Sequence, residues 1–517
     1  MRNASQLQMR ETNNSSIAVG VGTGVSGFIG KFQRGPINDA SILITSPEQL
    51  RRVHGTKNGP TNDLLLAERA LAGGGALRIV NVAMYTTPAD PSTLTATTAS
   101  NIQIKTSGDK VLLELKPKYA GASYNNLKAE VSAGIGNTFN LTLYIEGEET
   151  YTRETYQGLS IEKKTVLDSN WARAIVDGST LVDVVYKDLS AETGTLTAAA
   201  GTLTTSGGSD GTAITSAAYI GDAAARTGLH ALSPFTDISD FIIPAITDSV
   251  VNNAAASYAA SRGDVEAILA LPNTAKTAAT IISARQAITA DSKYYSVWAG
   301  GLKIYNPANG STIEITSVAD VVAATHRAEN EYGPYFSLAS DKRSQIFNAL
   351  GVVNNFGTPA DFANLDQLAR AGVNVIAAVG DGQLRVRGNY SGQTNGSSKA
   401  AYRNIVRGLI YIKKSLRKPI ERYLDEPCDF VTFKNLYNEI KPFLSTLESN
   451  RAVYPGGAVW EGDQLASKIS ELKINTAADL NVGKYRAKLH LNFINAINTI
   501  TLDISLEESG YTVNENI

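Results

Sequence analysis

Residues 42–82 read ILITSPEQLRRVHGTKNGPTNDLLLAERALAGGGALRIVNV, and this stretch decides the fold class. An apolar run comes first, followed by a helix start with Ser46 as N-cap, Pro47 as first helical residue and Gln49 as the partner in a capping box. A second helix is expected to begin near Asn62 and to stop at three glycines, after which the strand-like ALRIVNV follows. Strands that alternate with helices at this spacing indicate an α/β layer.

The same alternation returns between about residues 219 and 399. Ala-rich helical segments there separate four buried-strand candidates, which read FIIPAI, VEAILALP, YYSVWAGG and VNVIAAVG. The simplest arrangement joins residues 17–88 to residues 219–399 in one α/β core domain. The chain has 517 residues, which is long enough for several further domains.

Residues 89–218 show a β pattern only, and we expect them to form an antiparallel β domain inserted into the core. In FNLTLYIEG the apolar Phe139, Leu141, Leu143 and Ile145 alternate with more polar residues, as in a half-buried strand. Within residues 193–217, 21 of 25 residues are Ala, Thr, Ser or Gly. This composition is too poor in large apolar groups for a core of its own and is typical of a loop or a flexible edge.

Residues 400–517 are expected to form a C-terminal α+β assembly domain that starts with an amphipathic helix. Its apolar face is formed by Ile405, Leu409, Ile412, Leu416 and Ile420. Pro419 should break or kink this helix, and a second helix from Thr432 contains Pro442. The first helix also carries many cations against one acid, Glu421; they are Arg403, Arg407, Lys413, Lys414, Arg417, Lys418 and Arg422. Such a face is either solvated or complementary to an acidic protein partner.

Two strand-like segments close the chain, KYRAKLHLNF at residues 484–493 and TITLDISLE at residues 499–507. Each has one apolar face, formed in the first by Tyr485, Ala487, Leu489, Leu491 and Phe493, and in the second by Ile500, Leu502, Ile504 and Leu506. Two strands alone leave open edges, which another element of the chain covers or another chain pairs with. Residues 1–16 form a polar arm in which only Leu7 and Met9 stand out, and this arm is a candidate strand donor.

Composition excludes several classes of function. A net charge of −2 gives no general attraction for nucleic acid. One cysteine, Cys428, and four dispersed histidines provide neither a disulfide nor a metal site, so we expect no metal and no cofactor. The first residues lack the apolar core of a signal peptide, and no run approaches the roughly 20 apolar residues that span a bilayer. Synthesis in a reducing cytosol without membrane insertion is therefore expected.

Two short motifs suggest catalysis, but neither has the right context. Residues 22–27 fit GxGxxG, yet no helix start follows, so close packing in a Gly-rich strand is the better interpretation. Residues 207–211 fit GxSxG around Ser209, but they lie in the Ser/Thr/Gly-rich stretch rather than between a strand and a helix. We expect no catalytic residue and no enzyme; an α/β enzyme with an unrecognised site is the remote alternative.

Longer segments resemble contractile tail sheath proteins of bacteriophages and related injection machines. The opening segment GVSGFIGKFQRGPINDASILITSPEQLRRVHG and the later GGGALRIVNV are similar to the start of that family. The central segments GLHALSPFTDISDFIIPA, YYSVWAGGLKIYNPANG and LARAGVNVIAAVGDGQLRVRGNYS resemble its middle domain. RNIVRGLIYIKKSLRKPIERYLDEP and the closing strands resemble its C-terminal domain. The usual proline-rich opening strand and a Pro-Pro-Ser-Gly string of that family are missing here.

The resemblance implies a structural subunit that polymerises helically around an inner tube and contracts to drive the tube through a cell envelope, as in genome ejection by a phage. The implied partners are other sheath subunits, the tail tube protein, and baseplate and tail terminator proteins. The implied location is a virion tail assembled in the host bacterial cytoplasm, with an extracellular injection or secretion system as the alternative.

The resemblance also implies roles for particular residues. Terminal arms of one subunit would insert into the C-terminal sheets of its neighbours. Strand exchange would then involve Leu7, Met9, Tyr485, Leu489, Leu491, Phe493, Ile500, Leu502 and Ile504. The cations Lys413, Lys414 and Arg417 would face an acidic tube.

Overall fold

The computed structural model describes residues 22, 24–136, 138–161, 172, 176–185, 197–378 and 382–497. The chain divides into two compact units, Met1–Glu426 and Pro427–Ile517. The predicted mixed α/β class with several sheets is confirmed. The second unit starts 27 residues after the expected start of the C-terminal domain at residue 400, and helix α10 (Arg403–Glu421) therefore belongs to the first unit.

An eight-stranded sheet forms the centre of the first unit. Its strands, in spatial order, are β18 (Leu384–Arg387), β17 (Val373–Ala378), β13 (Tyr295–Ala299), β12 (Glu266–Ala270), β11 (Asp240–Ile242), β1 (Val25–Gly30), β3 (Ala76–Asn81) and β2 (Leu43–Ile44). The six inner strands run parallel, and β18 and β2 are antiparallel at the two margins. The four strand candidates between residues 219 and 399 are β11, β12, β13 and β17, and they lie in one sheet with β1, β2 and β3 from the first segment.

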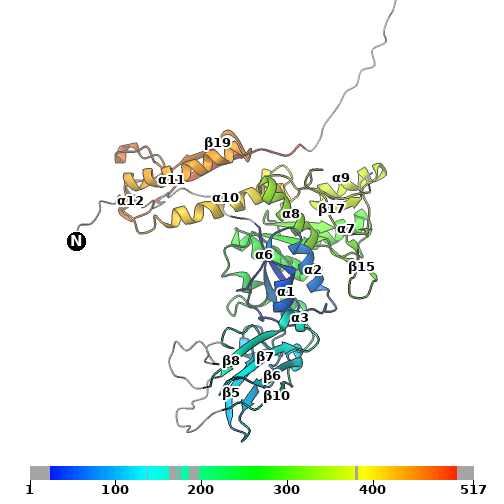
Figure 1. Cartoon of the computed structure of the whole chain (residues 1–517). Helices are drawn as coiled ribbons and strands as arrows, with labels where there is room; N and C mark the ends of the chain where they lie inside the picture. The colour runs from blue at the N-terminus through cyan, green and yellow to red at the C-terminus, as the bar shows by residue number, and fades with distance from the viewer. Residues whose placement is uncertain are drawn as a thin grey trace, which may run out of the picture. The chain divides into compact units, whose positions relative to one another are not determined.

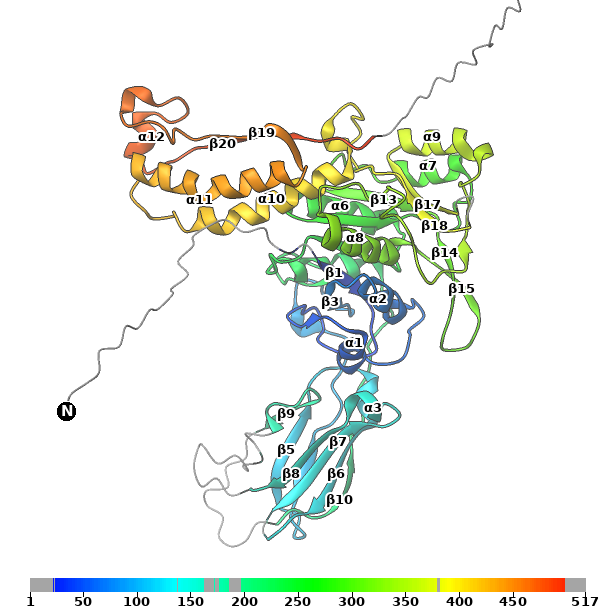
Figure 2. The same cartoon turned by 45° about the horizontal axis from the view of Figure 1, so that its top comes forward.

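Helices cover both faces of this sheet, because successive side chains of each inner strand point to opposite sides. Phe28 and Ile268 lie in the apolar cluster with α2 (Asp63–Leu71) and α8 (Val318–Tyr332). Ile29 and Leu269 lie in the cluster with α6 (Ser249–Arg262), α7 (Ala278–Gln286) and α9 (Phe362–Arg370). Figure 2 shows α7 and α9 side by side near β17. The inner strands are therefore buried along most of their length rather than alternating between buried and exposed residues.

Local sequence determines where the first helices begin. Helix α1 spans Pro47–His54, and the Ser46 hydroxyl accepts a hydrogen bond from the Gln49 backbone N–H at 3.2 Å, as predicted. The return contact goes to Thr45 instead of Ser46: the Gln49 Oε1 accepts from the Thr45 backbone N–H at 2.9 Å. Gly27 in β1 supports the packing interpretation of the GxGxxG motif, because a Cβ there would lie 2.6 Å from Leu232 Cδ1.

The described residues between 89 and 218 form two small antiparallel sheets with their own apolar cluster (Figure 1). One consists of β4 (Ile102–Lys105), β5 (Val111–Pro117) and β9 (Val182–Val185). The other consists of β10 (Gly201–Thr204), β6 (Leu127–Ala133), β7 (Phe139–Ile145) and β8 (Glu154–Leu159).

 Strand β8, at Glu154–Leu159, pairs with β7, whose residues alternate between buried and partly exposed from Phe139 to Ile145, as predicted. Strand β10 pairs with β6 at the margin of its sheet, so part of the Ala/Thr/Ser/Gly-rich stretch is an edge strand.

The second unit contains α11 (Phe430–Ser449), β19 (Val453–Glu461), α12 (Ala477–Asn481) and β20 (Lys488–Phe493). Strands β19 and β20 form an antiparallel pair that lies along α11 (Figure 2). Helix α11 continues through Pro442, and in the first unit α10 continues through Pro419 to Glu421. Of the break or kink expected at Pro419, the break is wrong. This residue is buried in the last turn of α10, where a proline removes only one backbone hydrogen bond near the helix end.

Shorter elements complete the described chain. The first unit also has a three-stranded sheet of β15 (Thr312–Ile315), β14 (Leu302–Tyr305) and β16 (Gly351–Val352). The remaining helical segments are α3 (Glu149–Thr152), α5 (Ser216–Ile220), η1 (Pro91–Thr93), η2 (Ala122–Asn126), η3 (Gly228–Leu232), η4 (Pro359–Asp361), η5 (Lys399–Ala401) and η6 (Ile469–Glu471). Within the ranges that the structure describes, no helix is long and apolar enough to cross a membrane.

Candidate functional site

The first half of α10 is fixed to the central sheet by a buried ionic cluster. Arg403 and Arg407 are one helical turn apart and therefore point to the same side of α10. They meet Asp240 and Glu266, the first residues of the neighbouring strands β11 and β12, which are paired in the sheet. All four residues are buried, with at most 4% of their surface exposed. The first half of α10 therefore packs on the amino ends of these two parallel strands.

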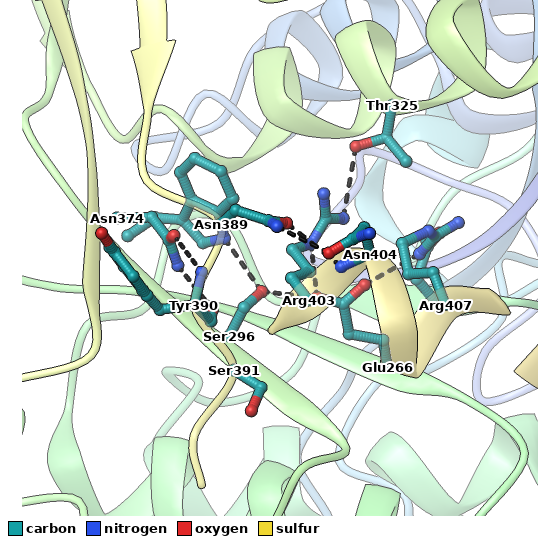
Figure 3. Close-up of polar contacts among 12 residues, drawn as sticks. Glu266, Ser296, Thr325, Asn374, Asn389, Tyr390, Ser391, Arg403, Asn404 and Arg407 are labelled. Carbon is teal, nitrogen blue, oxygen red and sulfur yellow. Dashed lines mark hydrogen bonds and ion pairs between the residues drawn. The ribbon is translucent and has the colours of Figure 1, made fainter. Parts of the chain in front are cut away.

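Direct contacts join these charges. The Arg403 Nε lies 2.6 Å from the Glu266 Oε1. The Arg407 Nη1 lies 2.9 Å from the Asp240 Oδ2 and 2.8 Å from the Glu266 Oε2, while its Nε pairs with Glu329 of α8. One guanidinium therefore bridges carboxylates from two strands and one helix. Figure 3 shows Arg403 and Arg407 converging on Glu266.

Neutral polar groups extend the cluster along the amino edge of the sheet. The Ser296 hydroxyl donates to the Glu266 Oε1 at 2.6 Å, and the Arg403 Nη2 donates to the Thr325 Oγ1 at 3.2 Å. Asn389 and Asn404 exchange hydrogen bonds at the start of α10, at 2.6 and 3.1 Å (Figure 3). Such charge-assisted and reciprocal bonds offset the desolvation of the buried charges.

The charges of the cluster determine its protonation. Burial acts to raise the pKa of Asp240, but Arg407 and other nearby positive charges outweigh burial and hold that pKa below its usual value. The pKa of Glu266 is lowered in the same way, with burial opposed by Arg403 and Arg407. His326 is also buried, and its burial lowers its pKa. Asp240 and Glu266 are therefore ionised and His326 is neutral near neutral pH.

Ser26, His326 and Asp240 lie together but do not form a hydrolase triad. The Ser26 hydroxyl donates directly to Asp240, and the His326 Nε2 lies 2.8 Å from the same hydroxyl. In a triad the imidazole lies between serine and aspartate and the serine is open to substrate. Here the serine lies in the middle, and all three residues are fully buried. Ser209 of the GxSxG motif lies on an exposed loop where its hydroxyl accepts from the Gly211 backbone N–H.

The structure places two of the three predicted tube-facing cations against the core. The Lys413 Nζ donates to the Gly263 carbonyl at 2.9 Å and to the Tyr294 hydroxyl at 2.6 Å. The Lys414 Nζ donates to the Thr236 carbonyl at 3.0 Å, and burial lowers its pKa to about 8.

Arg417 differs from the two lysines. Its Nε lies 2.7 Å from Glu421 one turn later on the same helix, and 54% of its side chain is exposed. The three cations line one cavity of about 500 Å³ between α10 and the loops that precede β11 and β12. Their predicted contact with a tube stays a prediction.

In the second unit, the four described residues of the predicted strand-exchange set share one face. Phe493 is buried, and Leu489, Leu491 and Tyr485 are partly buried, whereas the residues between them are exposed. The Tyr485 ring stacks on Phe433 of α11, with centroids 4.1 Å apart. The predicted alternation is present at these four positions, whereas Ala487, the fifth member of the predicted apolar row, is exposed. Tyr485 provides the contact with α11. Leu7, Met9, Ile500, Leu502 and Ile504 lie outside the described residues.

Strands β19 and β20 pair only with each other in the described part of the chain. Trp460 faces Leu489 and Glu461 faces Lys488 across the pair, and a bulge interrupts the register between Val453 and Ala458. The outer edge of each strand therefore has no partner strand among the described residues. Open edges of this kind are the usual sites of strand addition.

Sequence reasoning missed the ionic cluster, although it noticed the cations of α10. Arg403 and Arg407 were read as part of one basic face that is either solvated or partner-facing, but they are 4% exposed. The available indication was the pair of acids, Asp240 and Glu266, each placed at the start of a buried apolar run. A charge at that position needs a partner, and the arginine pair at four-residue spacing provides one.

Among the described residues, no group of three or more His, Cys, Asp or Glu is arranged to hold a metal ion.

Comparison with solved structures finds sheath proteins of similar fold. No protein-family model and no curated protein sequence matches the chain. A sheath tail protein from Listeria innocua aligns with a TM-score of 0.58 and 14% identity, over 86% of this chain and 89% of that protein. A sheath tail protein from Desulfitobacterium hafniense aligns with a TM-score of 0.53 and 16% identity, over 89% and 94%. The helical sheath of the anti-feeding prophage in its contracted state aligns with a TM-score of 0.55 and 12% identity, over 98% and 100%.

Proposed function

The chain has the fold of contractile tail sheath proteins, and from this premise we propose that it is a structural subunit of a contractile sheath. Many copies would polymerise helically around an inner tube and shorten together to drive the tube through a target cell envelope. The proposal assigns no catalytic residue, no cofactor and no metal to the chain.

The observation that carries the proposal is the length over which the fold is shared. The anti-feeding prophage sheath aligns over 98% of this chain and all of its own length, so the likeness includes the assembly unit as well as the core. A common α/β core alone would be weak support, because one fold serves many functions. A whole-length likeness to a polymer subunit also accounts for the two strand edges of the second unit that have no partner strand among the described residues.

The mechanism proposed is conformational. The subunit would assemble in an extended, metastable arrangement and change its contacts with its neighbours when the baseplate triggers contraction. A difference of about 1–2 kcal/mol per subunit, which is ordinary for an interface, becomes large when it is summed along a polymer. The ionic cluster supports this mechanism because it keeps α10 with the core while the contacts outside the subunit change.

The proposed contacts follow from the surfaces of the two units. Neighbouring sheath subunits would complete the β19–β20 sheet with donated terminal strands, which include Leu7 and Met9 at one end and Ile500, Leu502 and Ile504 at the other. An acidic tube surface would meet α10, where Arg417 is the most accessible of the three proposed cations. Baseplate and tail terminator proteins would meet the ends of the polymer.

Two settings remain for such a sheath. A bacteriophage tail, assembled in the bacterial cytoplasm and used for genome ejection, is the first. An extracellular contractile injection system is the second, and the likeness to the anti-feeding prophage sheath favours including it. Both settings use the same physical mechanism, and the presence of capsid genes beside the gene for this chain would identify the phage.

Negative-stain electron microscopy of the purified chain tests the proposal. Sheath subunits are expected to form long hollow cylinders of uniform diameter at micromolar concentration, in the absence of any other protein. A chain that stays monomeric or forms a small closed oligomer under all conditions of salt and concentration would contradict the proposal.

A further inference from the structure

A cavity of about 660 Å³ lies beside the last turns of α7 and α9. Its lining comes from the ends of these two helices, which lie side by side (Figure 2), and from residues 390–402, the segment that leads into α10. This volume is in the range of pockets that bind small molecules. Among the described residues that line the cavity are Arg285 and Arg370, and there is no aspartate or glutamate.

Arg285 is a buried cation of this lining that has no counter-ion in the described part of the chain. Four arginines are buried there, Arg34, Arg285, Arg403 and Arg407. Arg34 pairs with Glu148, and Arg403 and Arg407 pair with the acids of the ionic cluster. Arg285 is 6% exposed and has no carboxylate oxygen within 4 Å among the described residues. A buried cation without a counter-ion is unfavourable, so an anion in the cavity would stabilise it.

Backbone groups satisfy part of this guanidinium. Its Nη1 donates to the Ile288 carbonyl at 2.9 Å, and its Nη2 donates to the Gly392 carbonyl at 3.2 Å. The group also lies over the Tyr295 ring, 5.4 Å from the centroid, and the carbonyl end of α7 offsets about half of a unit charge. The Nε has no hydrogen-bond partner. Donors and part of the charge therefore remain uncompensated, because a guanidinium has five N–H groups.

The nearest acid along the sequence does not neutralise Arg285. The Asp291 Oδ1 accepts from the Thr394 backbone N–H at 2.9 Å and from the Gln393 Nε2 at 3.1 Å. Asp291 thus holds the segment before α10 and forms no ion pair with Arg285.

The other side chains of the lining suit an organic anion. Arg370, in the last turn of α9, pairs with Asp366, but the two side chains are 80% and 60% exposed. An exposed pair of this kind is weak, so the Arg370 guanidinium can turn toward a ligand. Tyr390 and Tyr402, which face each other across a β-bridge, add aromatic surface for an apolar part of the ligand.

We propose that this cavity binds a small organic anion whose carboxylate or phosphate group contacts Arg285, with Tyr390 and Tyr402 beside the rest of the molecule. A guanidinium suits both groups, because its planar fork matches two oxygens of either one. The site goes beyond the sheath function and does not depend on it. Because residues 390–402 lead into α10, a bound anion would hold this segment to the ends of α7 and α9 and stabilise the first unit.

Isothermal titration calorimetry of the full-length chain with citrate and with AMP tests the proposal. Citrate supplies carboxylates and AMP a phosphate, and at least one of them is expected to bind with a Kd of about 1 mM or tighter. Adenosine, which has the ring of AMP without its phosphate, should bind at least about tenfold more weakly than AMP. The probe that binds identifies the recognised group. Binding of neither probe, or of AMP and adenosine equally with no binding of citrate, would overturn the proposal.

A variant of the cation locates the bound anion. Arg285→Met removes the charge and is expected to weaken binding of the active probe by about tenfold or more. Arg417→Met removes an exposed arginine outside this cavity and should bind the probe like the wild type. Wild-type affinity in a folded R285M variant would place the anion elsewhere and overturn the proposal.

A second variant keeps the test decisive if R285M does not fold, since Arg285 also holds two carbonyl oxygens. A Cβ at Gly396, in the lining, would meet nothing within 4 Å, so Gly396→Leu adds bulk there without a clash and leaves Arg285 in place. This variant is expected to bind the active probe several-fold more weakly. Gly59→Leu, where a Cβ also meets nothing within 4 Å but which lies outside the lining, is the matched control. Wild-type affinity in both glycine variants would overturn the proposal.

Discussion

Arg407 is the residue on which most charges of the cluster converge. Its guanidinium contacts Asp240 of β11, Glu266 of β12 and Glu329 of α8. Buried carboxylates that lose their cation remain desolvated without compensation, and this cost exceeds the net stabilisation that the intact pair provides. Arg407 thus connects α10 to three elements that are far from it along the chain.

Replacement of this side chain should destabilise the first unit strongly. Arg407→Met is expected to cost about 3–5 kcal/mol, measured as a loss of stability of the core transition in urea by circular dichroism. Arg417→Met on the same helix removes an exposed pair and should cost at most about 1 kcal/mol. Similar midpoints for the two variants would mean that the cluster contributes no more than a surface pair does.

Asp63 makes the stability of the core depend on pH. This first residue of α2 is buried, and burial raises its pKa to about 7, against the hydrogen bonds from Thr61 and the Lys31 backbone that lower it. A carboxyl with a raised folded-state pKa favours the protonated form. Its contribution to stability is fully present below the unfolded-state pKa of 3.8 and is lost as the pH rises toward 7.

Asp63→Asn removes this dependence, because the amide does not ionise. The variant is expected to gain thermal stability relative to the wild type as the pH rises from 4 to 7, with the largest difference at about pH 8. Melting temperatures of both proteins at a series of pH values provide the measurement. A difference that stays constant between pH 4 and pH 8 would show that Asp63 does not titrate in this range.

At the scale of elements, α1 and the turn before α3 join the inserted β domain to the core. Glu148 pairs with the Arg34 Nη1 and accepts from the Gln33 Nε2 at 2.8 Å. The Arg34 Nη2 also donates to the carbonyls of Arg51 and Arg52 at the end of α1, at 2.9 and 3.0 Å. Arg34 and Glu148 are 1% and 4% exposed, so the joint between the two parts is buried.

Loss of this joint should loosen the inserted domain. Glu148→Ala leaves Arg34 buried without its carboxylate, and cleavage of the connections near residues 84–98 by a nonspecific protease is expected to become about tenfold faster. Glu146→Ala, two residues earlier, removes an exposed carboxylate that pairs with Lys128 and should leave the cleavage rate nearly unchanged. Equal cleavage of the two variants would argue against a buried joint.

At the scale of the whole molecule, the cations of α10 differ in whether they contact the core. Its first half pairs with buried acids, and Lys413 and Lys414 donate to carbonyl oxygens of the core. Reversing either lysine would disturb the subunit itself, so a failure to assemble would not identify an outside partner. Arg417 is free of such contacts with the core among the described residues and provides the cleaner test.

Arg417→Glu is expected to reduce co-assembly with an acidic tube protein several-fold, and the reduction should shrink as salt screens the contact. Co-sedimentation of the chain with preformed tubes measures this effect. Arg370→Glu on α9 also reverses an exposed arginine that pairs one turn away, with Asp366, and serves as the control. Normal co-assembly of the R417E variant at low salt would remove the support for a tube-facing role of this helix.

Local periodicity was enough to predict much of the fold. The α/β alternation, the cap at Ser46, the alternating strand from Phe139 to Ile145 and the two-faced strand that ends at Phe493 are all present. Each depends on side chains within a few positions of one another, so the sequence contains the whole pattern. The break at Pro419 was expected because a proline removes a helical hydrogen bond, but the residue lies in the last turn of α10, where few such bonds follow.

By itself the sequence determined the fold class, the order of the α/β and β segments and which face of each terminal strand is apolar. Only the tertiary structure decided that Arg403 and Arg407 are buried, that Lys413 and Lys414 hold core carbonyls, and that α10 belongs to the first unit. The partners of the two arginines lie 137, 141 and 167 positions away along the chain. A periodic pattern shows which face of a helix is basic, but the free energy of a charge depends on the groups that folding brings beside it, and those groups come from distant strands.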